Sequence, residues 1–174
     1  VYQLPSVADP ALSSDGSLLA YTHCWFDQEQ MESRSRIMVL NIADGESKEF
    51  TQGTSDSASK FAPNGSYLGF LRRGVDGLRQ LFVMLVGGGE ARCLTAEPRG
   101  VIDFDWSPDG QQLVYCADVD VETSAKDLQE NKVPTVTVVS RIHYRSDALG
   151  WRGDAHFHLF VIDIGGRSHR QLTD

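Results

Sequence analysis

The chain has 174 residues, of which 41% are hydrophobic and 23% charged, and its formal net charge is −8 at pH 7. This composition suits a folded domain with a sizeable core and argues against extensive disorder. The acidic balance disfavours a nucleic-acid binder, which needs basic residues to neutralise phosphates, and disfavours adsorption to an anionic membrane. We therefore expect neither nucleic acid nor a membrane as a partner.

Three segments share one pattern: a short apolar approach, an Asp-Gly or Asn-Gly pair, and a longer apolar run. They read PALSSDGSLLAYTHCW, ASKFAPNGSYLGFLRRG and DFDWSPDGQQLVYCAD, with intervals of 49 and 45 residues between Gly16, Gly65 and Gly110. Such pairs are strong hairpin signals, because the tight hairpin turn needs positive φ at both central residues. We therefore predict a hairpin at each pair, with both of its residues in that conformation.

The second half of each unit repeats as well. RIMVLNIADGESKEFTQG matches QLFVMLVGGGEARCLTAE and HLFVIDIGGRSHRQLTD, each a hydrophobic strand, a Gly-containing turn and a short strand ending near Thr51, Thr95 or Thr173. Together with the first hairpin, this makes four antiparallel strands in each unit. Four such strands repeating every 45 residues or so are typical of a β-propeller blade.

The middle strands of the units support this interpretation. Residues 81–86 and 159–162 form continuous apolar runs, whereas a sheet with one solvated face would alternate. A blade lies between two neighbours, so both of its faces are buried. The β-branched content and the flanking glycines disfavour a helix.

We therefore predict an all-β chain that forms an open arc of three four-stranded antiparallel blades, at about 9–53, 58–97 and 101–174. The third blade is long because of an insertion at about 118–155, which we expect to hold an extra hairpin or strand. Three blades cannot close a ring, since propellers have about four or more. We expect a larger parent propeller, of about seven or eight blades, and association through the open blade faces.

Two sets of residues resemble known proteins. Ser107 to Gly110, with the variants SSDG and APNG, resembles the repeats of TolB-like propellers. The stretch SRIHYRSDALGWRGDAHFHLFVIDIGG…RQLT is similar to part of the prolyl oligopeptidase family, above all its acylaminoacyl-peptidase and dipeptidyl-aminopeptidase branch. There an Arg and a Tyr precede an Asp-Gly-type turn, which here reads Asp147-Ala148-Leu149-Gly150. The resemblance covers essentially the whole chain, always to the N-terminal propeller.

In that family an α/β-hydrolase domain with a Ser-Asp-His triad follows the propeller, which filters substrates by size. The resemblance implies that this chain gates a separate hydrolase domain of a serine peptidase acting on short peptides, and that the hydrolase domain is absent from this chain. Its partners would be the peptide substrate and the C-terminal hydrolase domain of the same parent chain. The alternative is a stand-alone TolB-like propeller that binds proteins and catalyses nothing.

No complete catalytic motif occurs in the sequence. A nucleophile elbow needs Gly-x-Ser-x-Gly, and the nearest stretch, at 53–57, lacks the second glycine. The HExxH and Walker motifs are absent as well. We therefore assign no catalytic residue, no metal and no cofactor, and we expect this chain to be inactive by itself.

Two pairs of polar residues have a structural and a functional interpretation. His156 and His158 share one face of a predicted strand and are possible zinc ligands, but no third ligand stands at a known spacing, so we favour structural histidines. Asp103 and Asp105 also fall two apart on one strand, and glycosidases use paired carboxylates, but polar groups on the innermost strand of a blade commonly line the central channel or satisfy the backbone of the next blade. We expect both aspartates to have structural roles.

The strongest site candidate is a group of aromatic, guanidinium and carboxylate side chains in the insertion. Guanidinium groups bind carboxylates through paired hydrogen bonds, and carboxylates bind the ammonium group of a peptide. Arg145 and Trp151 belong to the same group. As residues that contact substrate or the hydrolase domain we select Arg141, Tyr144, Asp147, Arg152 and Asp154, with plain packing and salt bridging as the alternative.

The cysteines bear on the compartment. Cys24, Cys93 and Cys116 are odd in number and form no CxxC pair, which is typical of reduced thiols. No apolar run reaches transmembrane length and no signal peptide is visible. We therefore expect a cytoplasmic protein.

Overall fold

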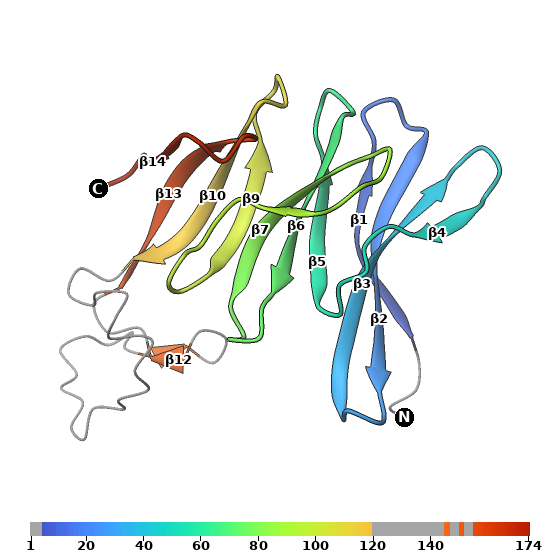
Figure 1. The fold of residues 1–174 in the computed structure, drawn as a ribbon, viewed down its shortest axis with the longest axis horizontal. Helices are drawn as coiled ribbons and strands as arrows, with labels where there is room; N and C mark the ends of the chain where they lie inside the picture. Colours follow the sequence, from blue (N-terminus) through green and yellow to red (C-terminus); the bar gives the residue numbers. More distant parts are fainter. Residues whose placement is uncertain (1–4, 120–144, 147–149, 152–154) are drawn as a thin grey trace.

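A computed structural model describes residues 5–119, 145–146, 150–151 and 155–174. Over these residues the chain forms three four-stranded antiparallel sheets and one two-stranded sheet. Figure 1 shows the three large sheets side by side in the order of the sequence. They confirm the predicted all-β arc of three blades. Within the described ranges there is no helix of the length and apolarity that a membrane span requires.

Each blade follows the chain order from its first strand to its fourth. Blade 1 contains β1 (Ser6–Leu12), β2 (Leu18–Asp27), β3 (Glu32–Asn41) and β4 (Ser47–Glu49). Blade 2 contains β5 (Asp56–Phe61), β6 (Tyr67–Arg73), β7 (Arg79–Leu85) and β8 (Arg92–Cys93). Blade 3 contains β9 (Val101–Trp106), β10 (Gln112–Val119), β13 (His156–Asp163) and β14 (His169–Gln171).

The insertion of blade 3 connects β10 to β13. It contains a short antiparallel hairpin, in which β11 (Arg145–Ser146) pairs with β12 (Gly150–Trp151), so the extra hairpin predicted there is confirmed. In blades 1 and 2 the same connection, from second to third strand, is a short turn. These two turns and the strands of the β11–β12 hairpin lie along one edge of the arc, at the bottom of Figure 1.

The hairpins between first and second strands lie where the Asp-Gly and Asn-Gly pairs predict, but the predicted conformation is wrong. Only the glycines have positive φ, at 71° for Gly16, 72° for Gly65 and 66° for Gly110. The physical reason is loop length. Ser13 both donates to the Leu18 carbonyl and accepts from the Gly16 amide, each at 2.9 Å, so four residues separate the closing pair instead of two.

In this longer loop the acidic or amide side chain has a role of its own. Asp15, Asn64 and Asp109 each accept a hydrogen bond of 3.0 Å from the backbone N–H two residues later. A short side chain with an oxygen at this position stabilises the turn without entering the left-handed region itself. The Asx-Gly pair therefore marks the hairpin through the side chain of its first residue and the backbone of its second.

The threonines near the end of each unit have one common role. Their hydroxyl oxygens accept a hydrogen bond from a backbone N–H of the third strand in the same blade. The donors are Ile37 for Thr51 at 3.1 Å, Leu81 for Thr95 at 2.9 Å and Leu159 for Thr173 at 3.0 Å. Each threonine therefore extends the pairing of the third and fourth strands beyond their backbone ladder.

Blade 2 is buried on both faces, as its continuous apolar run predicts. Leu81 and Val83 of β7 belong to the core shared with blade 3, which includes Phe104. Phe82, on the opposite side of β7, packs against the core shared with blade 1, which includes Ile37. Alternate residues of one strand thus enter two different cores, and this requires an unbroken apolar sequence.

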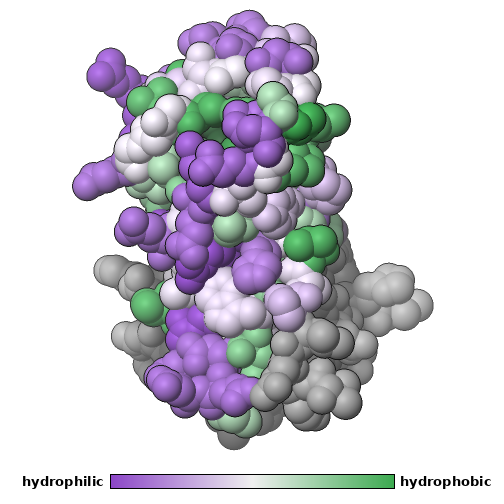
Figure 2. All heavy atoms as spheres, turned by 90° about the vertical axis from the view of Figure 1, so that its right-hand side faces the viewer, coloured by the Kyte–Doolittle hydropathy of each residue, from purple (hydrophilic) through white to green (hydrophobic). Residues whose placement is uncertain are grey.

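Among the described residues, no further blade packs against the outer faces of the arc. On blade 3, Phe160 and Ile162 are buried toward blade 2, whereas Phe157, Leu159 and Leu172 are exposed by 45%, 43% and 46%. Figure 2 looks onto the outer face of blade 1, where hydrophobic residues gather toward the top of the view among hydrophilic ones. Within the described residues, only one side of the apolar run of β13 is therefore buried against another blade.

Hydrogen bonds between side chains and backbone also join the blades. The indole N–H of Trp106 in blade 3 donates to the Lys60 carbonyl of blade 2 at 2.9 Å. The hydroxyl of Ser14 in blade 1 donates to the Pro63 carbonyl at 2.7 Å, and this contact joins two adjacent hairpin loops. These bonds fix the angle between neighbouring blades, so clefts between blades have defined walls.

Candidate functional site

The structure does not describe the residues that we selected from the sequence as contacts to substrate or to a hydrolase domain. Two strands of the insertion are described, but Arg141, Tyr144, Asp147, Arg152 and Asp154 all lie outside the described residues. Their role therefore stays a prediction.

The two histidines lie on β13, as expected. The ring Nδ1 of His158 lies 3.1 Å from the Thr173 carbonyl oxygen and 3.2 Å from its hydroxyl oxygen, so this nitrogen is engaged at the end of the blade. In the part of the chain that the structure describes, no group of three or more His, Cys, Asp or Glu side chains could hold a metal ion. The contacts with Thr173 support the structural interpretation of His158.

The aspartates of β9 have local and inter-blade partners. Asp103 and Asp105 accept hydrogen bonds from the adjacent backbone N–H groups of Phe104 and Trp106, at 2.8 and 2.9 Å. Asp103 also forms an ion pair with Lys60 of blade 2 at 3.2 Å. Lys60 in addition donates to the carbonyl of Phe104. The expected structural role is confirmed for Asp103, since it helps to hold blade 3 against blade 2.

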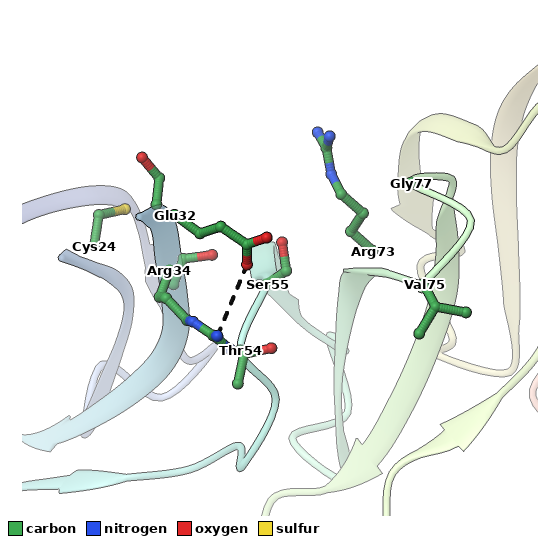
Figure 3. Close-up of a pocket in the computed structure, with 11 residues that line it drawn as sticks. Cys24, Glu32, Arg34, Thr54, Ser55, Arg73, Val75 and Gly77 are labelled. Atoms are coloured by element: carbon green, nitrogen blue, oxygen red, sulfur yellow. Dashed lines mark ion pairs between the residues drawn. The ribbon is translucent and has the colours of Figure 1, made fainter. Parts of the chain in front are cut away.

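A cavity that the sequence did not predict lies between blades 1 and 2. Its volume is about 760 Å³, and its lining comes from the start of β3, the residues before β5 and the hairpin between β6 and β7. Figure 3 shows its two walls, the start of β3 on one side and the hairpin between β6 and β7 on the other. Its polar and charged lining consists of Cys24, Glu32, Ser33, Arg34, Ser35, Thr54, Ser55 and Arg73.

The segment that joins the two blades forms the back of this cavity. The Ser35 amide of β3 donates to the Thr54 carbonyl at 3.0 Å, and Ser35 and Ser55 form an isolated parallel bridge. On the other side, the Arg73 amide of β6 donates to the Ser55 carbonyl at 3.0 Å. Residues 54 and 55 are therefore held between the two blades, and the backbone of Arg73 is fixed at the cavity.

The two guanidinium groups of the cavity differ in their partners. Arg34 lies 3.2 Å from an Asp27 carboxylate oxygen and 3.8 Å from a Glu32 carboxylate oxygen (Figure 3). Among the described residues, no carboxylate lies within ion-pair distance of Arg73. The side chain of Arg73 is thus a cation without an internal counter-ion, at the mouth of a cleft lined by hydroxyl groups.

A second cavity of about 700 Å³ shares Thr54 and Arg73 with the first. One of its walls is Arg72, whose guanidinium binds the carboxylate of Asp56. That hydrogen-bonded partner raises the pKa of Arg72 above its ordinary value, against the opposing effect of burial. The two consecutive arginines of β6 therefore differ, because Arg72 binds a buried carboxylate and Arg73 has no ion-pair partner among the described residues.

A third polar cluster joins the loop before β9 to the last strand. The Tyr115 hydroxyl donates to a Glu97 carboxylate oxygen at 2.6 Å, and the ring of His169 lies beside both groups. Burial, and after it the bond to Glu97, raises the pKa of Tyr115 above its ordinary range. Because His169 belongs to β14, we assign this cluster to the docking of that strand.

Comparison with known proteins adds the decisive observation. No family model matches the chain. It is 29% identical over 171 residues to the uncharacterized peptidase YuxL of Bacillus subtilis, a match that covers 97% of this chain and 26% of the relative. It is 28% identical over 118 residues to dipeptidyl-peptidase 5 of Porphyromonas endodontalis, covering 67% of this chain and 17% of the relative.

The chain is a propeller segment related in sequence to peptidases. It spans about a quarter or less of the length of these two relatives. This agrees with the resemblance found in the sequence, in which a propeller forms only the first part of a longer peptidase.

Solved structures show the same fold. An acylaminoacyl peptidase of Pyrococcus horikoshii superposes with a TM-score of 0.76 at 17% identity, over 98% of this chain and 26% of that one. The propeller domain of the Trilobed protease of Pyrococcus furiosus gives 0.66 at 10%, over 99% and 45%. A TolB protein of Agrobacterium tumefaciens gives 0.60 at 17%, over 98% and 50%. At these identities the likeness concerns the fold alone.

Proposed function

We propose that this chain is the substrate-gating propeller segment of a serine peptidase that acts on short peptides. The observation that carries the proposal is the 29% identity to a peptidase over 97% of the chain. The chain accounts for only 26% of that relative, which leaves room for the rest of a propeller and for a hydrolase domain. The catalytic triad would belong to that domain, because no nucleophile elbow occurs in this sequence.

The gating role follows from the physical properties of stacked blades. A ring of rigid blades set against a hydrolase domain admits extended or short peptides and excludes folded proteins, because the blades are joined by packed cores and hydrogen bonds. The β11–β12 strands lie at one edge of the arc (Figure 1), and we take the insertion that contains them as a candidate contact to the hydrolase domain or to substrate. In this proposal Arg141, Tyr144, Asp147, Arg152 and Asp154 provide those contacts.

The open faces support a larger parent propeller. Leu159 and Leu172 are exposed apolar residues on the outer side of blade 3, and such a surface is normally covered. We propose that the next blade of the parent chain covers it, and that the isolated chain self-associates through the same face. The three cysteines are all free thiols, which supports our placement in the cytoplasm.

The experiment begins with the complete reading frame. A Gly-x-Ser-x-Gly elbow followed by Asp and His supports the proposal, and a frame with only further blades would contradict it and favour a TolB-like interaction protein. The parent protein should hydrolyse acyl-peptide or aminoacyl p-nitroanilide substrates and be blocked by a serine-directed inhibitor. The 174-residue chain alone should show no turnover.

A matched pair of variants tests the insertion in the parent enzyme. Arg141→Ala should raise KM or lower kcat for peptides, since it removes a guanidinium that can pair with a carboxylate. Arg167→Ala, in the exposed turn before β14, is the control and should leave both constants unchanged. Unchanged peptide kinetics for Arg141→Ala would remove this residue from the proposed site.

A further inference from the structure

The cavity between blades 1 and 2 is lined by an arginine whose backbone is held in place and by hydroxyl groups that can donate hydrogen bonds. Arg73 extends from the end of β6, and its backbone is held on both sides, by the Ser55 carbonyl and by the pairing with Arg79 of β7. In Figure 3 its guanidinium stands across the cavity from the ion pair of Glu32 and Arg34. The backbone of Arg73 is therefore held in place, while its guanidinium is accessible to a ligand.

One charged group of the lining favours an anionic ligand. Arg34 is paired with the carboxylates of Asp27 and Glu32, whereas the guanidinium of Arg73 has no ion-pair partner among the described residues. The hydroxyl groups of Thr54 and Ser55 line the same space and can donate to an anion bound at Arg73.

The cavity also has an apolar side. Val75, at the tip of the hairpin between β6 and β7, is fully exposed and is one of the residues that line the cavity (Figure 3). A carboxylate on a small apolar body fits this combination of one guanidinium, two hydroxyl groups and one aliphatic side chain. An inorganic anion would leave Val75 unused.

We propose that this cavity binds the free carboxylate of a short peptide, with Arg73 as the ion-pairing group and Val75 in contact with the adjacent side chain. The proposal rests on the proposed function, and it adds a positioning site to the gate. A peptide anchored between blades 1 and 2 would be held at the edge of the arc where the β11–β12 strands lie. A guanidinium suits this role because it binds both carboxylate oxygens in one plane.

The test is binding to the 174-residue chain, followed by NMR through the backbone amides of Thr54, Ser55 and Arg73 at low salt. Three peptides are compared: acetyl-Ala-Leu-Phe with a free carboxylate, its C-terminal amide, and acetyl-Ala-Glu-Phe amide. We expect the free acid to bind and its amide to bind about tenfold more weakly, as for loss of one charged hydrogen-bonded contact. The third peptide carries its carboxylate on a glutamate side chain and has no free C-terminus. If it binds, the site recognises acidic side chains and the proposed recognition of the C-terminus is wrong. If it does not bind, the site recognises the C-terminal carboxylate, as proposed.

Variants locate the site. Arg73→Gln should weaken the free acid by about tenfold, Arg73→Lys should retain part of the affinity, and Arg167→Gln should change nothing. Equal binding of acid and amide, or full binding by folded Arg73→Gln, would overturn the proposal. If Arg73→Gln fails to fold, the comparison of acid and amide on the unmodified chain decides. Because the readout is binding, its failure is distinct from a failure of the parent enzyme to hydrolyse peptides.

Discussion

The carboxylate of Asp56 and the guanidinium of Arg72 face each other across β5 and β6 and form two hydrogen bonds, of 2.7 and 2.9 Å. Asp56 is completely buried, whereas the Arg72 side chain is 27% exposed. The guanidinium lies 5.3 and 5.0 Å from the ring centres of Phe70 and Phe82. No space remains beside the carboxylate, because a Cβ at Gly53 would lie 2.3 Å from it.

Removing the charge of Asp56 should destabilise the chain strongly. Asp56→Asn leaves Arg72 without its counter-ion in a partly buried position, and we expect a loss of about 2–4 kcal/mol in the free energy of unfolding. Urea denaturation followed by circular dichroism measures it. Glu29→Gln, in the exposed turn after β2, is the control and should stay within about 0.5 kcal/mol. A similarly small loss for Asp56→Asn would show that the pair contributes little.

The packing of blade 3 on blade 2 depends on the absence of a side chain at Gly69. A Cβ there would lie 2.8 Å from the Phe104 ring and 3.2 Å from the Trp106 ring, both in the core between the blades. Gly69→Ala should therefore cost about 1–3 kcal/mol through overpacking. Gly87→Ala, where nothing lies within 4 Å of the new Cβ, should cost nothing measurable. Equal effects of the two variants on the unfolding midpoint would contradict this account of the interface.

The threonine that ends each blade should matter in proportion to its burial. Thr95 is 7% exposed, accepts from the Leu81 amide at 2.9 Å and donates to the Gln80 side chain at 2.7 Å. Thr95→Val leaves these groups unpaired in the interior and should cost about 1–3 kcal/mol. Thr173→Val removes the same kind of bond at an exposed position, where water replaces it, and should cost less than about 1 kcal/mol. Thermal unfolding of both variants makes the comparison.

The carboxyl group of Asp15 should titrate at unusually low pH. Hydrogen bonds from the Ser13 hydroxyl, and then from the Ser17 amide and hydroxyl, lower its pKa from 3.8 to about 2. A carboxyl whose pKa is lower in the folded state contributes stability that is present above its unfolded pKa and is lost as the pH falls toward the folded one. Carboxyl NMR should therefore show titration near 2, and a midpoint near 3.8 would contradict the loop geometry.

The variant Asp15→Asn is the control for that titration. Asn64 occupies the equivalent position in blade 2 and makes the same 3.0 Å bond to the amide two residues later. The asparagine should therefore keep the first hairpin and remove the contribution of Asp15 to the stability change in acid. Thermal unfolding midpoints from neutral pH down into the range in which Asp15 titrates test this.

Local signals in the sequence predicted the strands and hairpins, but not the conformation of the turns. The Asx-Gly pairs and the terminal threonines form hydrogen bonds with backbone groups a few residues away or in the same blade. Their positions therefore predict strands and hairpins without knowledge of the fold. Whether the loop contains two residues or four depends on where Ser13 and Leu18 pair. That register is set by the packing of whole strands against the next blade.

The candidate cavity left no signal in the sequence. Glu32, Thr54 and Arg73 come from three separate stretches, and none of them belongs to a motif. Sequence analysis pointed instead to the insertion, because it interrupts the repeat. Nor does the order of residues distinguish Arg72 from Arg73, although one is paired and the other is not.

The sequence by itself determined that this chain is a run of propeller blades, because hairpin chemistry and apolar runs are local and repeat, and its resemblance to a known family pointed to peptidases. Only the tertiary structure decided which charged groups neutralise one another and which do not. Alternation along β6 directs neighbouring arginines to different surroundings, so Arg72 meets a buried carboxylate while Arg73 reaches a cavity between blades. The hairpin glycines predicted the arc, and the stacking of its blades created the candidate site.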